Sequence, residues 1–300
     1  MTQKSPDSSQ TKRRTPRREA PLADRVIAIT GAASGIGRAL ALDCARRGAR
    51  LALADLNQGD LSTLRSALLE RGLAERELSI HELDVRDRAA VEAWAADCAR
   101  TLGPADAIVN AAGVALHCPL DETTPEDFEW VMATNFWGTV YVTQAFLPQL
   151  KGRERSQVVN ISSVFGLIAF PASGAYVASK FAVRGFTEAL SIEMQLTHPH
   201  VRVTSVHPGG IETPLVRQGR VRGSGPLAST PEQVALSFER DLARTSPEAC
   251  AARIADALSR HQRRVLVGAD ARWIDRVVRL FPSSYQAIVT WALTRTRARR

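Results

Sequence analysis

The sequence predicts an α/β fold, with one doubly wound parallel sheet covered by helices on both faces. From Asp24 onward, short apolar or β-branched runs alternate with longer helical patterns, as they do in successive βαβ units. The first apolar run leads directly into a glycine-rich turn. Because the alternation continues almost to the end of the 300 residues, we expect one main domain rather than two small ones.

The apolar runs place seven strands, at residues 26–30, 50–54, 78–83, 107–110, 157–161, 202–206 and 265–267. Helix starts are marked at residues 124–126, 230–232 and 246–248, where a hydroxyl residue precedes proline and an acid. This order suits a helix, because the hydroxyl caps free N–H groups and the acid faces the positive end. Two further helices are predicted at residues 270–280 and 285–294.

Three segments organise the chain. Residues 1–21 are polar and basic without periodicity, which predicts a disordered leader. Residues 22–268 form the predicted Rossmann-fold domain, and residues 269–300 a helical extension with a basic tail. Residues 209–230 are rich in Gly, Arg, Ser and Pro, and are too long for a simple connection. This segment could form a mobile lid over a site, or it could be a disordered surface loop.

The net charge of +8 suggests a nucleic-acid partner until its position is considered. Without the ten bases and two acids of residues 1–20 and 295–300, the chain carries 29 bases and 29 acids. A folded basic groove for DNA or RNA is therefore not expected, although either tail could touch an anionic surface weakly. Hydrophobic residues at 45% and charged residues at 23% match an ordinary globular protein.

Neither a metal site nor a membrane span is expected. The four cysteines are scattered, with no CxxC pair and no nearby histidine at ligand spacing. No apolar run approaches the roughly 20 residues of a membrane span, and no apolar stretch follows the basic N-terminus. A cytoplasmic location is the default expectation. The apolar stripe of the last helix leaves three fates open: peripheral contact with a membrane, a subunit neighbour, or its own core.

Residues 30–37, Thr-Gly-Ala-Ala-Ser-Gly-Ile-Gly, follow the first predicted strand and open a helix. Glycine permits the tight turn, and backbone N–H groups at the helix start can then bind a pyrophosphate. Asp55 closes the second strand, where its carboxylate can accept hydrogen bonds from adenosine ribose hydroxyls and would repel a 2′-phosphate. We therefore expect NAD, with NADP as the alternative because Arg38 lies just past the turn.

A second cluster carries the chemistry. Tyr176 and Lys180 are four residues apart on a predicted helix, which puts both side chains on one face. An ammonium beside a phenol favours the phenolate, so Lys180 is expected to lower the pKa of Tyr176 and make it a general acid/base. Ser163 lies just beyond a predicted strand, at the carboxyl edge where parallel sheets bind ligands. Its hydroxyl could hold a substrate oxygen.

Together these motifs resemble the short-chain dehydrogenase/reductase family over roughly residues 24–268. The matching elements are TGxxxGxG at residues 30–37, Asn-Ala-Ala-Gly at residues 110–113, Asn135, Ser163, and YxxxK from Tyr176 to Lys180. Several motifs in the right order are far more specific than any one of them. One departure is visible: the second asparagine of the family's usual NNAG is Ala111 here. We expect this change to alter local hydrogen bonding rather than activity.

The resemblance implies a role for each matching residue. Tyr176 would exchange the proton of the substrate oxygen, Ser163 would orient that oxygen, and Lys180 would bind the nicotinamide ribose. Asn135, in the helix that begins at Pro125, would hold a water that links Lys180 to solvent. The implied cofactor contacts are Gly31, Ser34, Gly35, Ile36, Gly37 and Asp55, then Asp84 and Val85 at the adenine, Asn110, Ala112 and Gly113 at the strand edge, and Pro208, Gly209 and Thr213 at the nicotinamide.

The predicted function is hydride transfer between NAD(P) and an alcohol or carbonyl. Apolar residues after Ser163 and in the 209–230 segment favour an apolar substrate if they line the pocket. A methyltransferase would not need Ser163, Tyr176 and Lys180, whereas a non-catalytic dinucleotide sensor on the same fold remains an alternative. The resemblance also implies a homodimer or homotetramer built on the helices that contain Asn135 and Tyr176.

Overall fold

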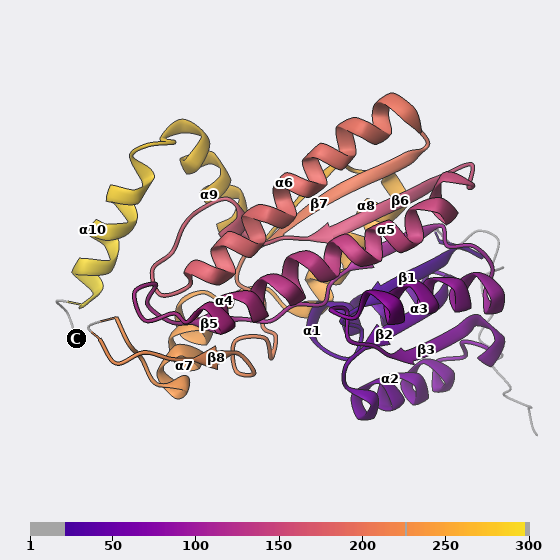
Figure 1. Cartoon of the computed structure of the whole chain (residues 1–300), viewed down its shortest axis with the longest axis horizontal. Helices are drawn as coiled ribbons and strands as arrows, with labels where there is room; N and C mark the ends of the chain where they lie inside the picture. Colours follow the sequence, from indigo (N-terminus) through magenta and orange to yellow (C-terminus); the bar gives the residue numbers. More distant parts are fainter. Residues whose placement is uncertain (1–21, 226, 298–300) are drawn as a thin grey trace, which may run out of the picture.

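The seven predicted strands form one parallel sheet in a computed structural model, which describes residues 22–225 and 227–297 (Figure 1). The strand order is β3-β2-β1-β4-β6-β7-β9. The strands are β1 (Val26–Thr30), β2 (Arg50–Asp55), β3 (Leu78–Glu82), β4 (Ala107–Asn110), β6 (Ser156–Ile161), β7 (Val201–Pro208) and β9 (Arg264–Val267). The predicted leader, residues 1–21, lies outside the described residues, as does the end of the basic tail.

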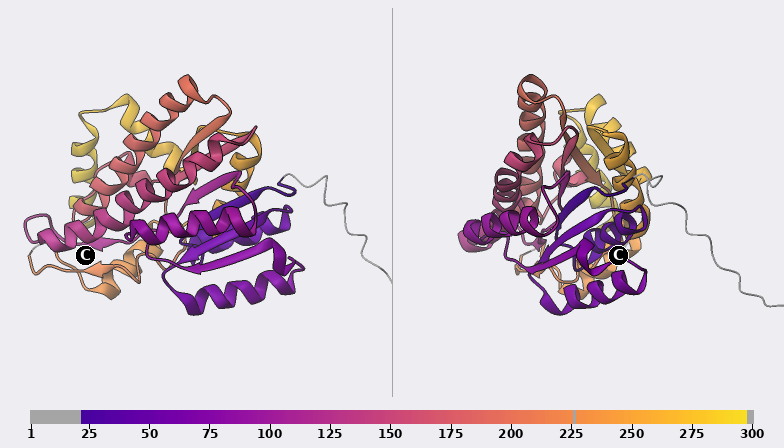
Figure 2. Two further views of the ribbon diagram at one scale, coloured as in Figure 1. Left: turned by 45° about the vertical axis from the view of Figure 1, so that its right-hand side comes forward. Right: turned by 90° about the vertical axis from the view of Figure 1, so that its right-hand side faces the viewer.

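The prediction of a doubly wound parallel sheet is confirmed, because two separate apolar cores lie on its two faces. One core joins the sheet to α1 (Gly35–Arg46), α2 (Gln58–Glu70) and α8 (Pro247–Arg260). The other joins it to α3 (Arg88–Thr101), α5 (Gly138–Lys151) and α6 (Gly174–Thr197). The turned views show these helices on both sides of the sheet (Figure 2). Strands buried on both faces explain why the sequence shows continuous apolar runs rather than alternation.

The chain reverses its direction of travel through the sheet between β1 and β4. β1 pairs with β2 on one side and with β4 on the other. In such sheets the crevice outside the carboxyl ends, at the point of reversal, is where ligands bind. The glycine-rich turn follows β1 and residues 111–113 follow β4, so both predicted cofactor segments lie at this point.

Two local features differ from the expected pattern. The helix that begins at Pro125 is continuous to Lys151, but it is α-helical only in α4 (Pro125–Met132) and α5, with a π-helical turn at Ala133–Trp137 between them. Asn135 lies within this turn. A second, two-stranded sheet joins β5 (Leu116–His117) to β8 (Arg220–Val221), inside the segment for which a lid or disorder was expected.

The remaining helices complete the chain. α7 (Pro231–Asp241) precedes α8, and both begin with the predicted hydroxyl cap and proline. α9 (Ala269–Leu280) and α10 (Tyr285–Arg297) follow the last strand and extend beyond the layers that cover the sheet (Figure 1). Within the described part of the chain, no helix combines the length and apolar character that a membrane crossing requires.

Candidate active site

The glycine-rich turn approaches neighbouring backbone too closely for any side chain. Gly31 has a φ of +64°, and a Cβ there would lie 2.7 Å from the backbone of Ala112, at the end of β4. A Cβ on Gly37 would lie 2.0 Å from the carbonyl oxygen of Gly31. Glycine is therefore required at both positions by the turn itself, and the turn is held against the end of β4.

The amino end of α1 presents free donors. Its N-cap, Ser34, makes no side-chain capping bond, and no acid lies in the first turn, which contains Gly35 and Ile36. Uncapped N–H groups at the positive end of a helix form a site for an anion. Thr213 closes the opposite side, because a Cβ on Gly35 would lie 3.1 Å from its methyl group. These residues fit the pyrophosphate of a dinucleotide.

Asp55 lies beside this cradle at the end of β2. Its carboxylate accepts hydrogen bonds from the N–H of Ala33, at 2.9 Å, and of Asn57, at 3.0 Å. The charge is thus fixed at the edge of the turn, where a ribose next to a bound pyrophosphate would lie. The following residue, Leu56, is exposed and brings no cation. This arrangement suits free ribose hydroxyls better than a phosphate group.

The other predicted cofactor residues differ in what their side chains contact. Asp84 forms an ion pair with Arg86, which lowers the pKa of the Asp84 carboxyl, while Val85 is buried against Gly138. Asn110 turns its side chain into the core. Its amide donates to Asn160 Oδ1 at 2.7 Å and to a threonine of α5. The Asn110 side chain therefore lies in the core, and its Oδ1 has no hydrogen-bond partner among the described residues.

Ser163 and Tyr176 meet beyond the carboxyl end of β6. A side-chain hydrogen bond joins them and lowers the pKa of the Tyr176 phenol, but burial acts more strongly and raises that pKa to about 12. The Ser163 hydroxyl also accepts the N–H of Phe165 at 3.1 Å. Serine and tyrosine hydroxyls held together can bind one substrate oxygen from two sides.

Lys180 lies one helical turn beyond Tyr176 and is buried. Its ammonium donates to the carbonyl of Ile161 at 3.1 Å and lies 5.6 Å from the centre of the Tyr176 ring. Burial lowers the pKa of Lys180 to about 8. Lys180 is not among the groups that shift the Tyr176 pKa in this structure, so its expected lowering of that pKa stays a prediction. The ammonium is directed at a backbone carbonyl, and the desolvation of the phenol dominates.

Asn135 joins the same cluster from the π-helical turn. Its side-chain amide pairs with both backbone groups of Val114, at 2.8 and 3.1 Å, and donates to Ser179 Oγ at 3.0 Å. A Cβ on Gly113 would lie 3.2 Å from Asn135 Oδ1 and 3.6 Å from Lys180 Nζ, so Gly113 leaves the space where they approach. The predicted grouping of Asn135, Ser163, Tyr176 and Lys180 is present in the geometry. The water relay stays a prediction.

Sequence reasoning missed His207. This fully buried side chain lies in β7, with Nδ1 3.1 Å from the Ser163 carbonyl oxygen and Nε2 2.9 Å from Ser205 Oγ. Because a carbonyl only accepts, Nδ1 carries the proton. Burial, above all, lowers the His207 pKa to about 4. A neutral imidazole therefore holds the backbone of Ser163. The only sequence signal was its place at a strand end, directly before Pro208.

The end of β7 is held by the C-terminal part of the chain. Pro208 and Gly209 lead out of the strand, and Gly210 donates its N–H to the Asp270 carboxylate at 2.8 Å. A Cβ on Gly209 would lie 2.0 Å from the same carboxylate. Asp270 belongs to the first turn of α9. The segment predicted to face the nicotinamide is thus positioned by a residue that sequence reasoning did not single out.

The expected apolar lining is only partly available. Val164, Leu167 and Ile168 are buried and belong to the core. Phe165 remains half-buried with its ring 6.2 Å from that of Tyr176, edge to face, and it stacks on Phe170 at 5.2 Å. Aromatic rings next to the Tyr176 phenol give this side of the site an apolar wall.

The segment after β7 is tied to the start of α4. Arg220 and Arg222 form ion pairs with the Asp127 carboxylate, at 2.8 and 3.2 Å. The Glu122 carboxylate accepts both N–H groups of Ser224 and Gly225. These bonds and the β5–β8 pair connect the described part of the segment to the rim of the site, and whether it moves as a lid stays a prediction.

The described residues contain no group of three or more His, Cys, Asp or Glu side chains that could hold a metal ion. The four cysteines are buried, and burial raises the thiol pKa of three of them, Cys44, Cys98 and Cys250, to about 12. Thiols of this kind are poor nucleophiles.

The fold and the grouping of Ser163, Tyr176 and Lys180 at the carboxyl edge of its sheet point to a family of oxidoreductases. The model of the short chain dehydrogenase family matches residues 25–222, and the chain belongs to this family. It is 42% identical over 265 residues to the Mycobacterium tuberculosis protein named "Putative oxidoreductase SadH", covering 88% of this chain and 94% of that protein. Human dehydrogenase/reductase SDR family member 7 is 32% identical over 67% of this chain and 59% of its own length.

Solved structures of short-chain dehydrogenases share the fold of this chain. A short-chain dehydrogenase/reductase from Burkholderia phymatum in complex with NAD superimposes with a TM-score of 0.78 at 28% identity, covering 87% of this chain and 95% of that one. A short-chain dehydrogenase from Mycobacterium paratuberculosis bound to NAD gives 0.70 at 29% identity, covering 82% and 97%. The chain is therefore similar to NAD-bound members of its family.

Proposed function

We propose that this protein transfers a hydride between NAD and an apolar alcohol or carbonyl compound, with Tyr176 as the general acid/base. The observation that carries this proposal is the meeting of Tyr176 and Ser163 by a hydrogen bond, at the carboxyl edge of the sheet and beside the glycine-rich turn. A non-catalytic dinucleotide sensor would have no need for this pair, or for a buried lysine one turn away.

Each part of NAD would have its own set of residues. Asp84 and Val85 would lie at the adenine, Asp55 at the adenosine ribose, and residues 31–37 at the pyrophosphate. Asn110, Ala112 and Gly113 would support the next portion, and Pro208, Gly209 and Thr213 the nicotinamide. Bound NAD supplies the acceptance or donation of a hydride. The fixed carboxylate of Asp55 favours NAD over NADP.

The chain's own residues would orient the substrate and move one proton. Ser163, held by His207 through its backbone, would donate a hydrogen bond to the substrate oxygen. Tyr176 would take the hydroxyl proton during oxidation, or give it during reduction. Lys180 would bind the nicotinamide ribose and pass the proton toward Asn135 and solvent. The rings of Phe165 and Phe170 would contact an apolar substrate.

Exposed apolar side chains on α6 and on the π-helical turn before α5 support a homodimer or homotetramer. Trp137, Phe181, Ile192 and Leu196 are 47%, 38%, 60% and 80% exposed. All four lie on the continuous helix of Asn135 or on α6, which contains Tyr176. Large apolar side chains left exposed on two neighbouring helices are typical of an interface. Light scattering on the purified protein would give the subunit number.

The function is tested with Tyr176→Phe, which keeps the ring and removes the hydroxyl. NADH binding, followed by nicotinamide fluorescence, should stay unchanged, while turnover of a panel of apolar alcohols and ketones should fall by about 10²- to 10⁴-fold. Tyr141→Phe is the matched control, because the Tyr141 ring lies in α5 and stacks on Trp137. The turnover of this variant should not change.

Equal turnover in Tyr176→Phe would remove Tyr176 from the mechanism. A wild-type protein that binds NADH but converts no alcohol or ketone would favour the dinucleotide sensor.

A further inference from the structure

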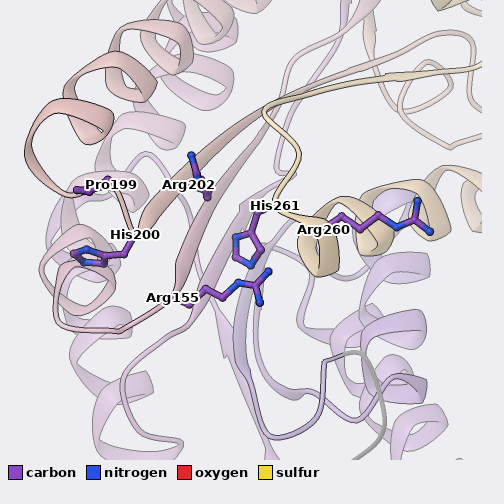
Figure 3. Close-up of a pocket in the computed structure, with 6 residues that line it drawn as sticks. All are labelled: Arg155, Pro199, His200, Arg202, Arg260 and His261. Atoms are coloured by element: carbon purple, nitrogen blue, oxygen red, sulfur yellow. The ribbon is translucent and has the colours of Figure 1, made fainter.

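The opposite edge of the sheet holds a cavity of about 330 Å³. It lies where the chain enters β6 and β7 and where α8 ends. Because the strands are parallel, this is the amino-terminal edge, on the far side of the sheet from Ser163 and Tyr176. The cavity is lined by Arg155, Pro199, His200, Arg202, Arg260 and His261 (Figure 3).

Basic side chains make up this lining almost completely. Five of the six lining residues are arginine or histidine, and none is acidic. Within residues 22–225 and 227–297, no carboxylate forms an ion pair with Arg155, Arg202 or Arg260, whereas the neighbouring Arg153 is paired with Asp106. Positive charges gathered in a concave site without counter-charges attract anions.

His261 is the most unusual part of the cavity. It caps α8 in the left-handed conformation, with φ of 52° and ψ of 45°, which is uncommon for a residue other than glycine. Both ring nitrogens are buried and have no hydrogen-bond partner among the described residues. Burial, together with Arg155, Arg25 and Arg202, lowers the His261 pKa to about 4. Buried polar atoms without partners are rare and call for a ligand or water.

The lining side chains differ in where they point. Arg155 and His261 have their side chains next to each other in Figure 3, and Arg202 comes from the adjacent strand β7. Arg260 extends away from the cavity along α8 in this conformation. His200 uses Nε2 to donate to the Lys151 carbonyl, at 3.0 Å, which leaves its Nδ1 available. The charged groups that act on His261 are the guanidinium groups of Arg155, Arg25 and Arg202.

We propose that this cavity binds a phosphoryl group, as inorganic phosphate or as the phosphate monoester of a small molecule. A phosphoryl dianion offers several oxygens to the guanidinium groups of Arg155 and Arg202 and to the ring of His261, and it balances more than one positive charge. A single carboxylate would leave most of these donors unused. The site lies across the sheet from the catalytic residues, so the proposal is independent of the proposed function.

The test follows the ring signals of His261 by NMR as the pH is changed. The signals are assigned by their absence in His261→Asn, since asparagine also tolerates the left-handed conformation. Inorganic phosphate is compared with sodium chloride at the same ionic strength. Phosphate should raise the pH midpoint of the His261 ring by about one unit or more, because a nearby opposite charge favours the protonated form.

Two variants locate the binding site. Arg155→Gln/Arg202→Gln should weaken phosphate binding at least tenfold, and the exposed Arg155→Gln alone gives the same test if the double variant does not fold. Arg253→Gln is the matched control, an exposed arginine on α8 outside the cavity, and should bind phosphate as the wild type does. Glycerol phosphate that binds more tightly than inorganic phosphate would identify a monoester as the ligand, and equal binding would identify free phosphate.

An identical His261 titration in phosphate and in chloride would overturn the proposal. Binding that survives the loss of Arg155 and Arg202 would overturn it as well, because the phosphate would then occupy another site.

Discussion

The two edges of the central sheet treat charge in opposite ways. At the carboxyl edge, Lys180 is buried and Tyr176 is half-buried, and the ammonium of Lys180 donates to a backbone carbonyl. At the amino edge, Arg155 and Arg260 are exposed and unpaired within the described part of the chain. Burial makes a pKa sensitive to a few fixed neighbours, whereas exposed charges act together and are screened by salt. The first arrangement would suit the proposed proton transfer, and the second would suit the proposed binding of an anion.

The comparison is tested most strongly by Lys180→Met. Turnover should fall by at least about a hundredfold, because the group beside Tyr176 is lost. The free energy of unfolding at pH 7 should rise by about 1–2 kcal/mol, since an apolar side chain replaces a buried charge. Urea unfolding and steady-state kinetics measure the two effects. Lys151→Met, at the end of α5, should change neither, and a Lys180 variant that was both active and less stable would contradict the comparison.

The next largest effect is the pH dependence of the free energy of unfolding that His207 contributes. Its pKa is about 4 when folded and near 6.5 when unfolded, so the unfolded chain binds more protons between these values. The stability contributed by neutral His207 is present above pH 6.5 and is lost as the pH falls toward 4, by roughly 3 kcal/mol. His207→Gln should flatten this part of the curve in urea unfolding at a series of pH values. His198→Gln is the control, and an unchanged slope in His207→Gln would disprove the assignment.

A smaller effect is expected at Asp55. Asp55→Ala removes the carboxylate that holds the Ala33 N–H and would contact the ribose, so NADH binding should weaken roughly tenfold, or about 1.4 kcal/mol. NADPH binding should improve, because a repelling charge is gone. Titration with each nucleotide measures both changes. Asp60→Ala, in the exposed first turn of α2, should leave them unaltered, and tighter NADPH than NADH binding by the wild type would reverse the cofactor preference.

The smallest expected effect is a change in the free energy of unfolding caused by a substitution at the amino-terminal edge of the sheet. Arg155→Gln should raise the free energy of unfolding by a few tenths of a kcal/mol at low salt, because it relieves repulsion among arginines. The gain should disappear at high ionic strength. Urea unfolding in a buffer free of phosphate measures this gain, and Arg253→Gln, an exposed position on α8 outside the cavity, is the control. A gain that persisted at high salt would point to packing rather than charge.

The sequence predicted the fold well, because a parallel sheet buried on both faces leaves continuous apolar runs separated by capped helices. The strand bounds at residues 26–30 and 107–110 agree with the structure at both ends. The β5–β8 pair could not be predicted, since two residues in each strand give no periodicity and more than a hundred residues separate them.

The catalytic grouping was predictable for a different reason. YxxxK spacing fixes Tyr176 and Lys180 on one helix face, and a residue after a strand end must lie at the carboxyl edge. Side-chain direction is set by contacts between distant segments, and the sequence does not show it. Asn110 therefore turned out to face the core, and His207, which holds Ser163 from the next strand, was missed.

The bond between Gly210 and Asp270 makes the C-terminal helices part of the machinery around the site. One carboxylate at the start of α9 fixes the chain just after β7, next to the residues proposed to face the nicotinamide. A force applied to α9 or α10, by a neighbouring subunit or another surface, would reach that segment through this hydrogen bond. A displacement of α9 or α10 would then shift the residues that are proposed to face the nicotinamide.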